Sequence, residues 1–359
     1  MRITIVGGGN IGTQFAVHCA EKGHDVIVYT SKPELFEGPL NIVNEEGTII
    51  HRGVIKLATA DPKEGFGDAE LIFITVPATM MQSVAEEIYE YSDKNAMIGV
   101  VPGNGGSECA FHRCIKRGNV FFGIERVPAI ARLIEKGKTV RSTGYRNELH
   151  VAALPKKYAK KCAELVSSIF DKKTIAIPDY LNLTMTPSNP ILHTTRLRTI
   201  FQTWHEGVVY DSIPLFYEDW NNESSELLIA CDEEVQSICR ALPEFKMQYV
   251  MPLTVYYESP TVEAMTKKIS SIEAFKGLAT PTVIVNGGII PDLHSRYFTA
   301  DFSYGLAIIK QIADFVEVQA TNIDSIMAWY RNIAIEKKEF CFRDYNITDI
   351  MSFKEFYLI

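Results

Sequence analysis

The sequence predicts an α/β protein with an N-terminal Rossmann domain built on a parallel-core sheet, followed by a mainly helical C-terminal domain. In the first half, short apolar runs alternate with segments whose apolar residues recur at helical spacing. In the second half the helical spacing dominates. A glycine-rich turn also follows the first apolar run directly. With 359 residues, the chain is long enough for two domains.

The first half contains a series of apolar segments that are typical of buried strands. We expect these strands at Arg2–Val6, Asp25–Tyr29 and residues 71–76, 96–101 and 120–124. Helical stripes lie between them, one of which consists of Met81, Val84 and Ile88. Because the strands are continuously apolar and amphipathic helices separate them, the pattern indicates a parallel sheet covered on both faces.

Around residues 175–190 the pattern changes to a stretch rich in Pro, Asn and Thr. We therefore place the domain boundary near residue 180, with a dinucleotide-binding domain over 1–180 and a substrate domain over 181–359. Residues 280–301 show no sustained period and contain Pro281, Gly287 and Gly288. Long irregular stretches inside a compact domain are usually functional or disordered, so we expect an irregular segment of one of these two kinds there.

Composition excludes several classes of function. The 44 acidic and 36 basic residues give a net charge of -8, which argues against a general nucleic-acid-binding role. No apolar run approaches the roughly 18 residues that span a bilayer, so we expect no membrane partner. The chain enters its first expected strand at Arg2, which predicts a cytoplasmic protein without a signal peptide. The seven cysteines form no Cys-x-x-Cys pair, so we expect free thiols and no metal.

The glycine-rich turn fits the dinucleotide-binding pattern Gly-x-Gly-x-x-Gly. It consists of Gly7, Gly8, Gly9, Asn10, Ile11 and Gly12. Between a strand and a helix, Gly7 permits the tight turn, Gly9 lets the backbone approach a pyrophosphate, and Gly12 allows close packing of helix on strand. The helix N-terminus, which includes Asn10 and Ile11, presents free N–H groups to the phosphates. The turn therefore predicts a nicotinamide dinucleotide site.

The residues after the second expected strand indicate which dinucleotide is preferred. An NAD enzyme carries Asp or Glu there, because a carboxylate binds the ribose diol. This chain has Thr30, Ser31 and Lys32 instead, whose hydroxyls and cation suit a 2′-phosphate. We therefore favour NADP(H). NAD(H) is the alternative, with Glu34 in the acidic role.

The carboxyl ends of parallel strands line the ligand crevice of such a sheet. Val76 and Pro77 stand at the end of one expected strand, and Asn104 follows the next. We expect these residues beside the ribose and the nicotinamide. Glu125, after residues 120–124, is a further candidate for the crevice, with a surface carboxylate as the alternative.

Hydride transfer to a carbonyl or imine needs a proton donor, commonly histidine, and an acidic substrate needs a cation. His193 follows Asn189 at the expected domain junction, where clefts form. Near the end of the irregular segment, Arg296 is a potential carboxylate clamp and Asp301 a potential histidine partner. The structural alternatives are a packing histidine and an Arg296–Asp301 ion pair.

Two motifs of this sequence resemble the octopine/nopaline (opine) dehydrogenase family: Asn189-Pro190-x-x-His193 and Arg296-Tyr297-Phe298-x-x-Asp301. The resemblance covers both domains. Members of that family join a 2-oxo acid to an amino acid and reduce the resulting imine with NAD(P)H. The resemblance implies that His193 is the acid–base, that Arg296 binds a substrate carboxylate, and that Asp301 orients His193. Asn189 would bind substrate or the carboxamide. The chain departs from the family pattern at Ala300, where an acidic residue is expected.

Two alternative functions stay open at this point. Ketopantoate reductase and glycerol-3-phosphate dehydrogenase share the two-domain plan, but the sequence lacks their lysine–asparagine arrangement near the junction. A non-catalytic NADP(H)-binding sensor would bind the coenzyme without turnover. The expected partners are small molecules, a 2-oxo acid and an amino acid, and a homo-oligomer is compatible with the sequence.

Overall fold

The computed structural model describes residues 1–186, 188–335 and 338–359. The chain divides into two compact units, one formed by Met1–Thr184 with Lys354–Ile359 and the other by Met185–Phe353. The division falls a few residues after the position expected from sequence. The C-terminal end of the chain returns to the first unit.

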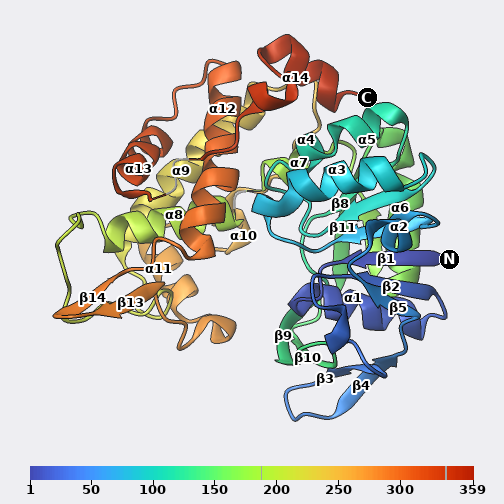
Figure 1. Ribbon diagram of the computed structural model, residues 1–359. Helices are drawn as coiled ribbons and strands as arrows, with labels where there is room; N and C mark the ends of the chain where they lie inside the picture. The colour runs from blue at the N-terminus through green and yellow to red at the C-terminus, as the bar shows by residue number, and fades with distance from the viewer. Residues whose placement is uncertain (187, 336–337) are drawn as a thin grey trace. The chain divides into compact units, whose positions relative to one another are not determined.

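The first unit is built on an eight-stranded sheet with the order β12-β11-β8-β7-β6-β1-β2-β5. Figure 1 labels β1, β2, β5, β8 and β11 of this sheet. Its strands are β1 (Arg2–Val6), β2 (Asp25–Tyr29), β5 (Leu57–Thr59), β6 (Leu71–Ile74), β7 (Met97–Val100), β8 (Phe121–Ile124), β11 (Glu148–Leu154) and β12 (Lys173–Ala176). Neighbouring strands pair in parallel, except β8 with β11. The predicted Rossmann sheet is therefore confirmed. Because β1 lies between β2 and β6, the strand order reverses there, and ligands bind at such a point.

Helices cover both faces of this sheet, which explains its continuously apolar strands. On one face Ile5 packs into a core with Phe15 and Phe170, whose ring centroids lie 4.6 Å apart. On the other face the Thr4 hydroxyl donates to the Gly65 carbonyl at 2.5 Å. The helices of this unit are α1 (Asn10–Glu21), α2 (Pro62–Phe66), α3 (Met81–Tyr91), α4 (Ser107–Ala110), α5 (His112–Arg117), α6 (Ala159–Phe170) and α7 (Leu181–Thr184).

A second, four-stranded sheet with the order β4-β3-β10-β9 packs against α1 and was not predicted. It consists of β3 (Leu40–Val43), β4 (Ile49–Gly53), β9 (Ile130–Glu135) and β10 (Thr139–Thr143). Its strands are short, and Ile49 and Ile50 of β4 and Ile134 of β9 are exposed, so the apolar residues of those two strands do not mark a buried face.

The C-terminal residues are tied to the first unit by a buried carboxyl group. Glu108 Oε1 accepts hydrogen bonds from Tyr357 Oη at 2.5 Å and Thr184 Oγ1 at 2.6 Å. Burial raises the pKa of Glu108, although both hydrogen bonds oppose that shift. Through Tyr357, α14 (Ile350–Tyr357) connects the end of the chain to this unit.

The second unit is mainly helical, as predicted. Its helices are α8 (Ser188–Ile200), α9 (Asn222–Arg240), α10 (Leu253–Tyr256), α11 (Val262–Ser270), the π-helix η5 (Tyr297–Leu306), α12 (Ala307–Phe315) and α13 (Thr321–Ile333). The side chain of Asn221 caps α9 by accepting from Ser224 N, and Thr261 caps α11 in the same way at Ala264 N. Within the described part of the chain, no helix combines the length and apolarity needed to cross a bilayer.

The prediction of an irregular segment over 280–301 is wrong. Strands β13 (Thr282–Val285) and β14 (Gly288–Pro291) form an antiparallel hairpin, and η5 begins at Tyr297. Gly287 and Gly288 make the turn with φ of 95° and 149°, which other residues rarely adopt. The hairpin has no clear sequence pattern because Ile284 is 89% exposed, so its apolar residues do not report a buried face.

The buried carboxyl of Asp232 on α9 makes the stability of the second unit depend on pH. Its Oδ2 accepts from Leu253 N at 2.7 Å, and burial raises the pKa of Asp232 from 3.8 to about 6. The pKa of Asp232 is higher in the folded than in the unfolded protein. The protonated carboxyl therefore contributes fully to the free energy of unfolding at low pH, and this contribution is lost as the pH rises through about 6. The loss amounts to roughly 3 kcal/mol.

We expect Asp232→Asn, which keeps an acceptor for Leu253 N, to leave stability nearly unchanged at about pH 4. At about pH 8 it should raise the free energy of unfolding by roughly 2–3 kcal/mol. Urea unfolding at the two pH values measures both quantities. Equal effects at both would contradict the assignment.

Candidate active site

The glycine turn has the geometry that a dinucleotide needs. Gly7 has a φ of 103°, and a Cβ on Gly12 would lie 1.7 Å from the Gly7 carbonyl oxygen, so only glycine fits there. A Cβ on Gly9 would meet no atom within 4 Å, which leaves room for a ligand beside the backbone. Gly9 precedes α1 without a side-chain cap. The first N–H groups of α1, including those of Asn10 and Ile11, therefore suit a pyrophosphate.

Two other sequence-predicted residues lie at this turn. An ideal Cβ on Gly8 would be 3.2 Å from Thr30 Oγ1, and one on Gly7 would be 3.1 Å from a methyl carbon of Val76. Thr30 and Val76 thus flank the turn from β2 and β6. Their neighbours Ser31 and Lys32 are exposed, and Pro77 and Asn104 lie in the loops after β6 and β7.

Two further candidates in this unit have structural partners. The Asn10 side-chain oxygen accepts from Leu133 N of β9 at 2.7 Å, so this oxygen has a structural role in addition to the backbone N–H at the start of α1. Glu125 Oε2 lies 2.8 Å from His150 Nδ1, and Arg126 Nε donates to Oε1 at 3.3 Å. Burial opposes the shift, but these two partners hold the pKa of Glu125 below its usual value. The arrangement favours a structural carboxylate at Glu125.

In the second unit, His193 is the centre of a buried hydrogen-bonded chain. It lies on α8, is 4% exposed, and its Nδ1 is 2.7 Å from Asp301 Oδ2 on η5. Its Nε2 is 2.7 Å from Tyr217 Oη. The two predicted motifs meet where η5 packs against α8. Gly305 permits this close packing, because an ideal Cβ at that position would lie only 3.0 Å from the Pro190 ring.

In the series Tyr217–His193–Asp301, the donor and the acceptor of each hydrogen bond can be assigned. A carboxylate at Asp301 accepts the Nδ1 proton of His193, which leaves the Nε2 lone pair to accept from the Tyr217 hydroxyl. Burial raises the pKa of Tyr217 well above its usual value, and the neighbouring Tyr297 adds to the shift. Tyr217 is therefore a neutral phenol that can donate. The Tyr297 ring lies 4.6 Å from the imidazole and excludes water from one side of it.

Arg296 and Asn189 both lie at the start of a helix and are exposed. The guanidinium of Arg296 lies 5.6 Å from the Tyr297 ring centroid. Within the described ranges Arg296 forms no ion pair, so the alternative of an Arg296–Asp301 pair is not observed. The charge of Arg296 is thus available for a ligand beside the Asp301–His193 pair.

Sequence reasoning missed Tyr217 and the residue that holds its loop. Arg196, one turn after His193 on α8, is 1% exposed and donates to the carbonyls of Phe216 and Asp219 at 2.8 and 2.7 Å. Burial lowers the pKa of Arg196 to about 10. The sequence shows an arginine three residues after His193, on the same face of the expected helix. No neighbouring sequence feature indicates that this arginine holds the loop that carries Tyr217.

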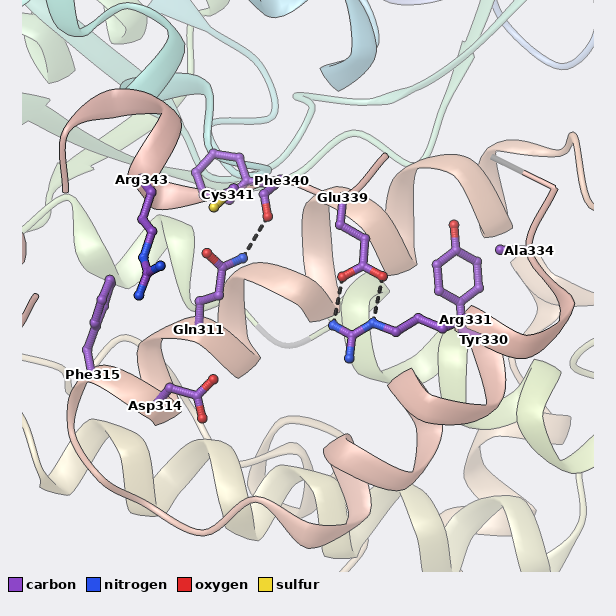
Figure 2. A pocket seen from close by; sticks show the side chains of 10 residues that line it. All are labelled: Gln311, Asp314, Phe315, Tyr330, Arg331, Ala334, Glu339, Phe340, Cys341 and Arg343. Carbon is purple, nitrogen blue, oxygen red and sulfur yellow. Dashed lines mark hydrogen bonds and ion pairs between the residues drawn. The ribbon is translucent and has the colours of Figure 1, made fainter. Parts of the chain in front are cut away.

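A separate cavity of about 680 Å³ lies in the second unit (Figure 2). Figure 2 shows Arg331 of α13 paired with Glu339 through two hydrogen bonds of 2.9 and 2.8 Å. None of the sequence-predicted site residues lines this cavity. We therefore assign it no role in binding or catalysis by the Tyr217–His193–Asp301 chain.

A dinucleotide-type glycine turn in one unit and a buried Tyr–His–Asp chain with an unpaired arginine in the other define an NAD(P)-dependent oxidoreductase. Residues 176–334 match the alpha-helical domain of NAD/NADP octopine/nopaline dehydrogenase. Residues 2–104 match the N-terminus of NAD-dependent glycerol-3-phosphate dehydrogenase. The helical part of the chain, residues 176–334, is therefore of the octopine/nopaline dehydrogenase type, as the two motifs within it predicted.

Whole-length comparisons agree with this assignment. Octopine dehydrogenase of Mizuhopecten yessoensis is 26% identical, with 92% of this chain and 89% of that protein covered. A solved octopine dehydrogenase with NADH and L-arginine superposes with a TM-score of 0.84 at 20% identity, covering 98% of this chain and 97% of that one. A ketopantoate reductase from Ralstonia eutropha reaches a TM-score of 0.63 at 16% identity, covering 92% and 97%. The ketopantoate-reductase alternative is therefore the more distant one.

Proposed function

We propose that this protein condenses a 2-oxo acid with an amino acid and reduces the resulting imine with NAD(P)H, acting as an opine dehydrogenase. The observation that carries the proposal is the hydrogen-bonded chain Tyr217–His193–Asp301 beside the unpaired Arg296. A proton relay next to a free cation suits a substrate that carries both a carboxylate and a nitrogen to be protonated or deprotonated. We assign coenzyme binding to residues 1–180 and substrate binding to residues 181–359.

In this proposal Arg296 binds the carboxylate of the 2-oxo acid through two parallel N–H···O bonds. His193 accepts a proton from the ammonium group of the amino acid through the Tyr217 hydroxyl, which donates to its Nε2, so that the neutral amine can attack the oxo carbon. The same histidine returns the proton to the carbinolamine hydroxyl, which leaves as water and gives the protonated imine, so that addition of a hydride yields the neutral secondary amine without a further proton. Asp301 stabilises the intervening imidazolium. Bound NAD(P)H supplies the hydride that converts the imine carbon into the secondary amine.

Other family structures support this substrate class. Octopine dehydrogenase has been solved with NADH and L-arginine, and also with NADH and pyruvate. An amino acid and a 2-oxo acid therefore both bind in a protein of this fold. The seven cysteines are all free thiols, which supports a reducing, cytoplasmic compartment for the reaction.

For the coenzyme we propose a preference for NADPH over NADH. Thr30 lies at the glycine turn, and the exposed Lys32 forms no ion pair among the residues that the structure describes. Yersinopine dehydrogenase, a structural neighbour, has been solved with NADP+. Hydroxyls and a free cation after β2 would bind a 2′-phosphate.

We expect Thr30→Asp to weaken NADPH binding by about tenfold or more and to move the preference toward NADH, because a carboxylate repels a phosphate and accepts from a ribose diol. Fluorescence titration with both coenzymes measures the ratio. Thr48→Asp, on an exposed turn, is the matched control. Tighter NADH than NADPH binding by the unmodified protein would refute the preference.

Arg296→Lys should raise the KM for the 2-oxo acid by about tenfold or more, with a smaller change in coenzyme affinity. The reason is that lysine is a point charge that cannot reproduce a two-point carboxylate contact. Arg343→Lys, on the separate cavity, is the control. Initial rates against 2-oxo acid concentration give the result, and an unchanged KM would remove Arg296 from the substrate site.

Coenzyme absorbance at 340 nm, a wavelength set by the nicotinamide rather than by this protein, provides the direct functional screen. NADPH and NADH are each tested against a matrix of 2-oxo acids and amino acids, with every component omitted in turn. We expect oxidation only when both substrates are present. Oxidation with a 2-oxo acid alone would favour a hydroxy-acid dehydrogenase, and binding without turnover would favour a sensor.

A further inference from the structure

Far along α1 from its glycine turn, three side chains with metal-binding chemistry converge. His18 and Glu21 lie three residues apart on α1, and His51 comes from β4, which packs against that helix. One ligand atom from each residue lies within 4.8 Å of the other two. We propose that His18, Glu21 and His51 form a binding site for a Zn²⁺-like divalent transition metal. This site is independent of the proposed reaction.

The second observation is an unsatisfied nitrogen. His18 is only 5% exposed, and its Nε2 has no hydrogen-bond partner within the described residues. Buried polar nitrogens are almost always bonded, so an orphan of this kind calls for an explanation. The His51 ring lies 4.7 Å from the His18 ring, so His18 belongs to the same cluster. A metal ligated by His18 would supply the interaction that the protein itself does not provide.

The ligand atoms of His51 and Glu21 already lie close together. His51 Nδ1 lies 2.8 Å from Glu21 Oε2, and a proton occupies the space between them. Zn²⁺ with bonds of about 2.0–2.1 Å holds tetrahedral ligand atoms roughly 3.3 Å apart. A metal can therefore replace that proton after a small opening of this pair, and the separations to His18, which are at most 4.8 Å, would shorten as the ion binds. Glu21 and His51 are partly exposed, which leaves a fourth position for water.

Two lysines act electrostatically on His18, and one of them has an acidic partner. Lys22, next to Glu21, is paired with Asp171, and Lys172 lies over the Tyr145 ring at 5.5 Å. Two imidazoles with one carboxylate select zinc and its neighbours over Mg²⁺ or Ca²⁺, which prefer all-oxygen sites. The absence of a metal site expected from cysteine spacing does not bear on this set, because it contains no cysteine. Bound metal would tie β4 to α1 and stabilise the first unit.

The test uses the full chain after chelator treatment, titrated with ZnCl₂ by calorimetry and with CoCl₂ by visible absorption. We expect one site per chain, a d–d absorption band of protein-bound Co²⁺, and a rise in melting temperature with Zn²⁺ but not with Mg²⁺. His51→Gln and the exposed Glu21→Gln should each weaken binding by about tenfold or more. His24→Gln, at the turn after α1, should not.

Two results would overturn the site. One is the absence of Zn²⁺ binding at millimolar concentration by the wild-type chain. The other is unchanged affinity in both His51→Gln and Glu21→Gln, because the ion would then sit elsewhere. Since Glu21 is exposed, its variant is expected to fold, and coenzyme binding by that variant verifies the fold. Neither readout depends on catalytic turnover.

Discussion

Replacing His193 with alanine is expected to lower kcat by about 10²–10⁴-fold. The imidazole lies within hydrogen-bond distance of both Asp301 and Tyr217, and histidine is the commonest general acid–base in enzymes, whereas burial holds Tyr217 as a neutral phenol. Coenzyme affinity should stay within about twofold, because His193 lies in the second unit and the glycine turn lies in the first.

Stopped-flow or steady-state rates with saturating substrates, together with coenzyme titration, measure the two effects separately. His205→Ala is the matched control, because His205 is exposed and its ring lies at hydrogen-bond distance from the carbonyl of the neighbouring Glu206. A His193→Ala variant that keeps more than about half of the wild-type kcat would remove His193 from proton transfer.

Asp301→Asn is expected to depress kcat by a similar factor, although it preserves the size of the side chain. An asparagine amide can donate toward Nδ1 of His193, where the carboxylate accepts at 2.7 Å. The imidazole would then carry its proton on Nε2, facing Tyr217, and could no longer accept there. Comparable tautomer errors in a Ser-His-Asp arrangement cost about 10⁴-fold.

Loss of the negative charge also removes support for the imidazolium, so the acidic limb of the kcat/KM profile should move to lower pH. Asp211→Asn, an exposed carboxylate of the same unit, controls for the change in net charge. If Asp301→Asn left both kcat and the pH profile unchanged, Asp301 would be a residue that only fixes η5 against α8.

The parts of the fold that the sequence revealed are those in which local pattern and tertiary environment coincide. Strands such as β1 and β6 are covered on both faces, so all residues of β6 and all but the first residue of β1 are buried. The glycine turn could also be predicted from the sequence, because the close contact of Gly12 with the Gly7 carbonyl leaves no space for a side chain and so requires glycine. The small β4-β3-β10-β9 sheet had no such signature, because its exposed isoleucines obscure the alternation.

The candidate site also contains residues that the sequence predicts and residues that it does not. His193 and Asp301 could be paired from sequence because two motifs carried them, whereas Tyr217 lies in a turn that shows no pattern of its own. Its position depends on Arg196, whose buried guanidinium bonds to backbone carbonyls rather than to a recognisable side chain. The His18–Glu21–His51 cluster depends on the contact of β4 with α1, which residue spacing could not predict.

The most direct measurement of the central claim follows the transferred hydrogen and the nitrogen together. The enzyme is given coenzyme deuterated at the transferring C4 position, a 2-oxo acid and a ¹⁵N-labelled amino acid, and the products are analysed by mass spectrometry. The proposal predicts a single secondary amine that contains both labels, with the deuterium on the carbon derived from the oxo group. A deuterated 2-hydroxy acid beside unchanged ¹⁵N-amino acid would contradict it and would point to carbonyl reduction instead.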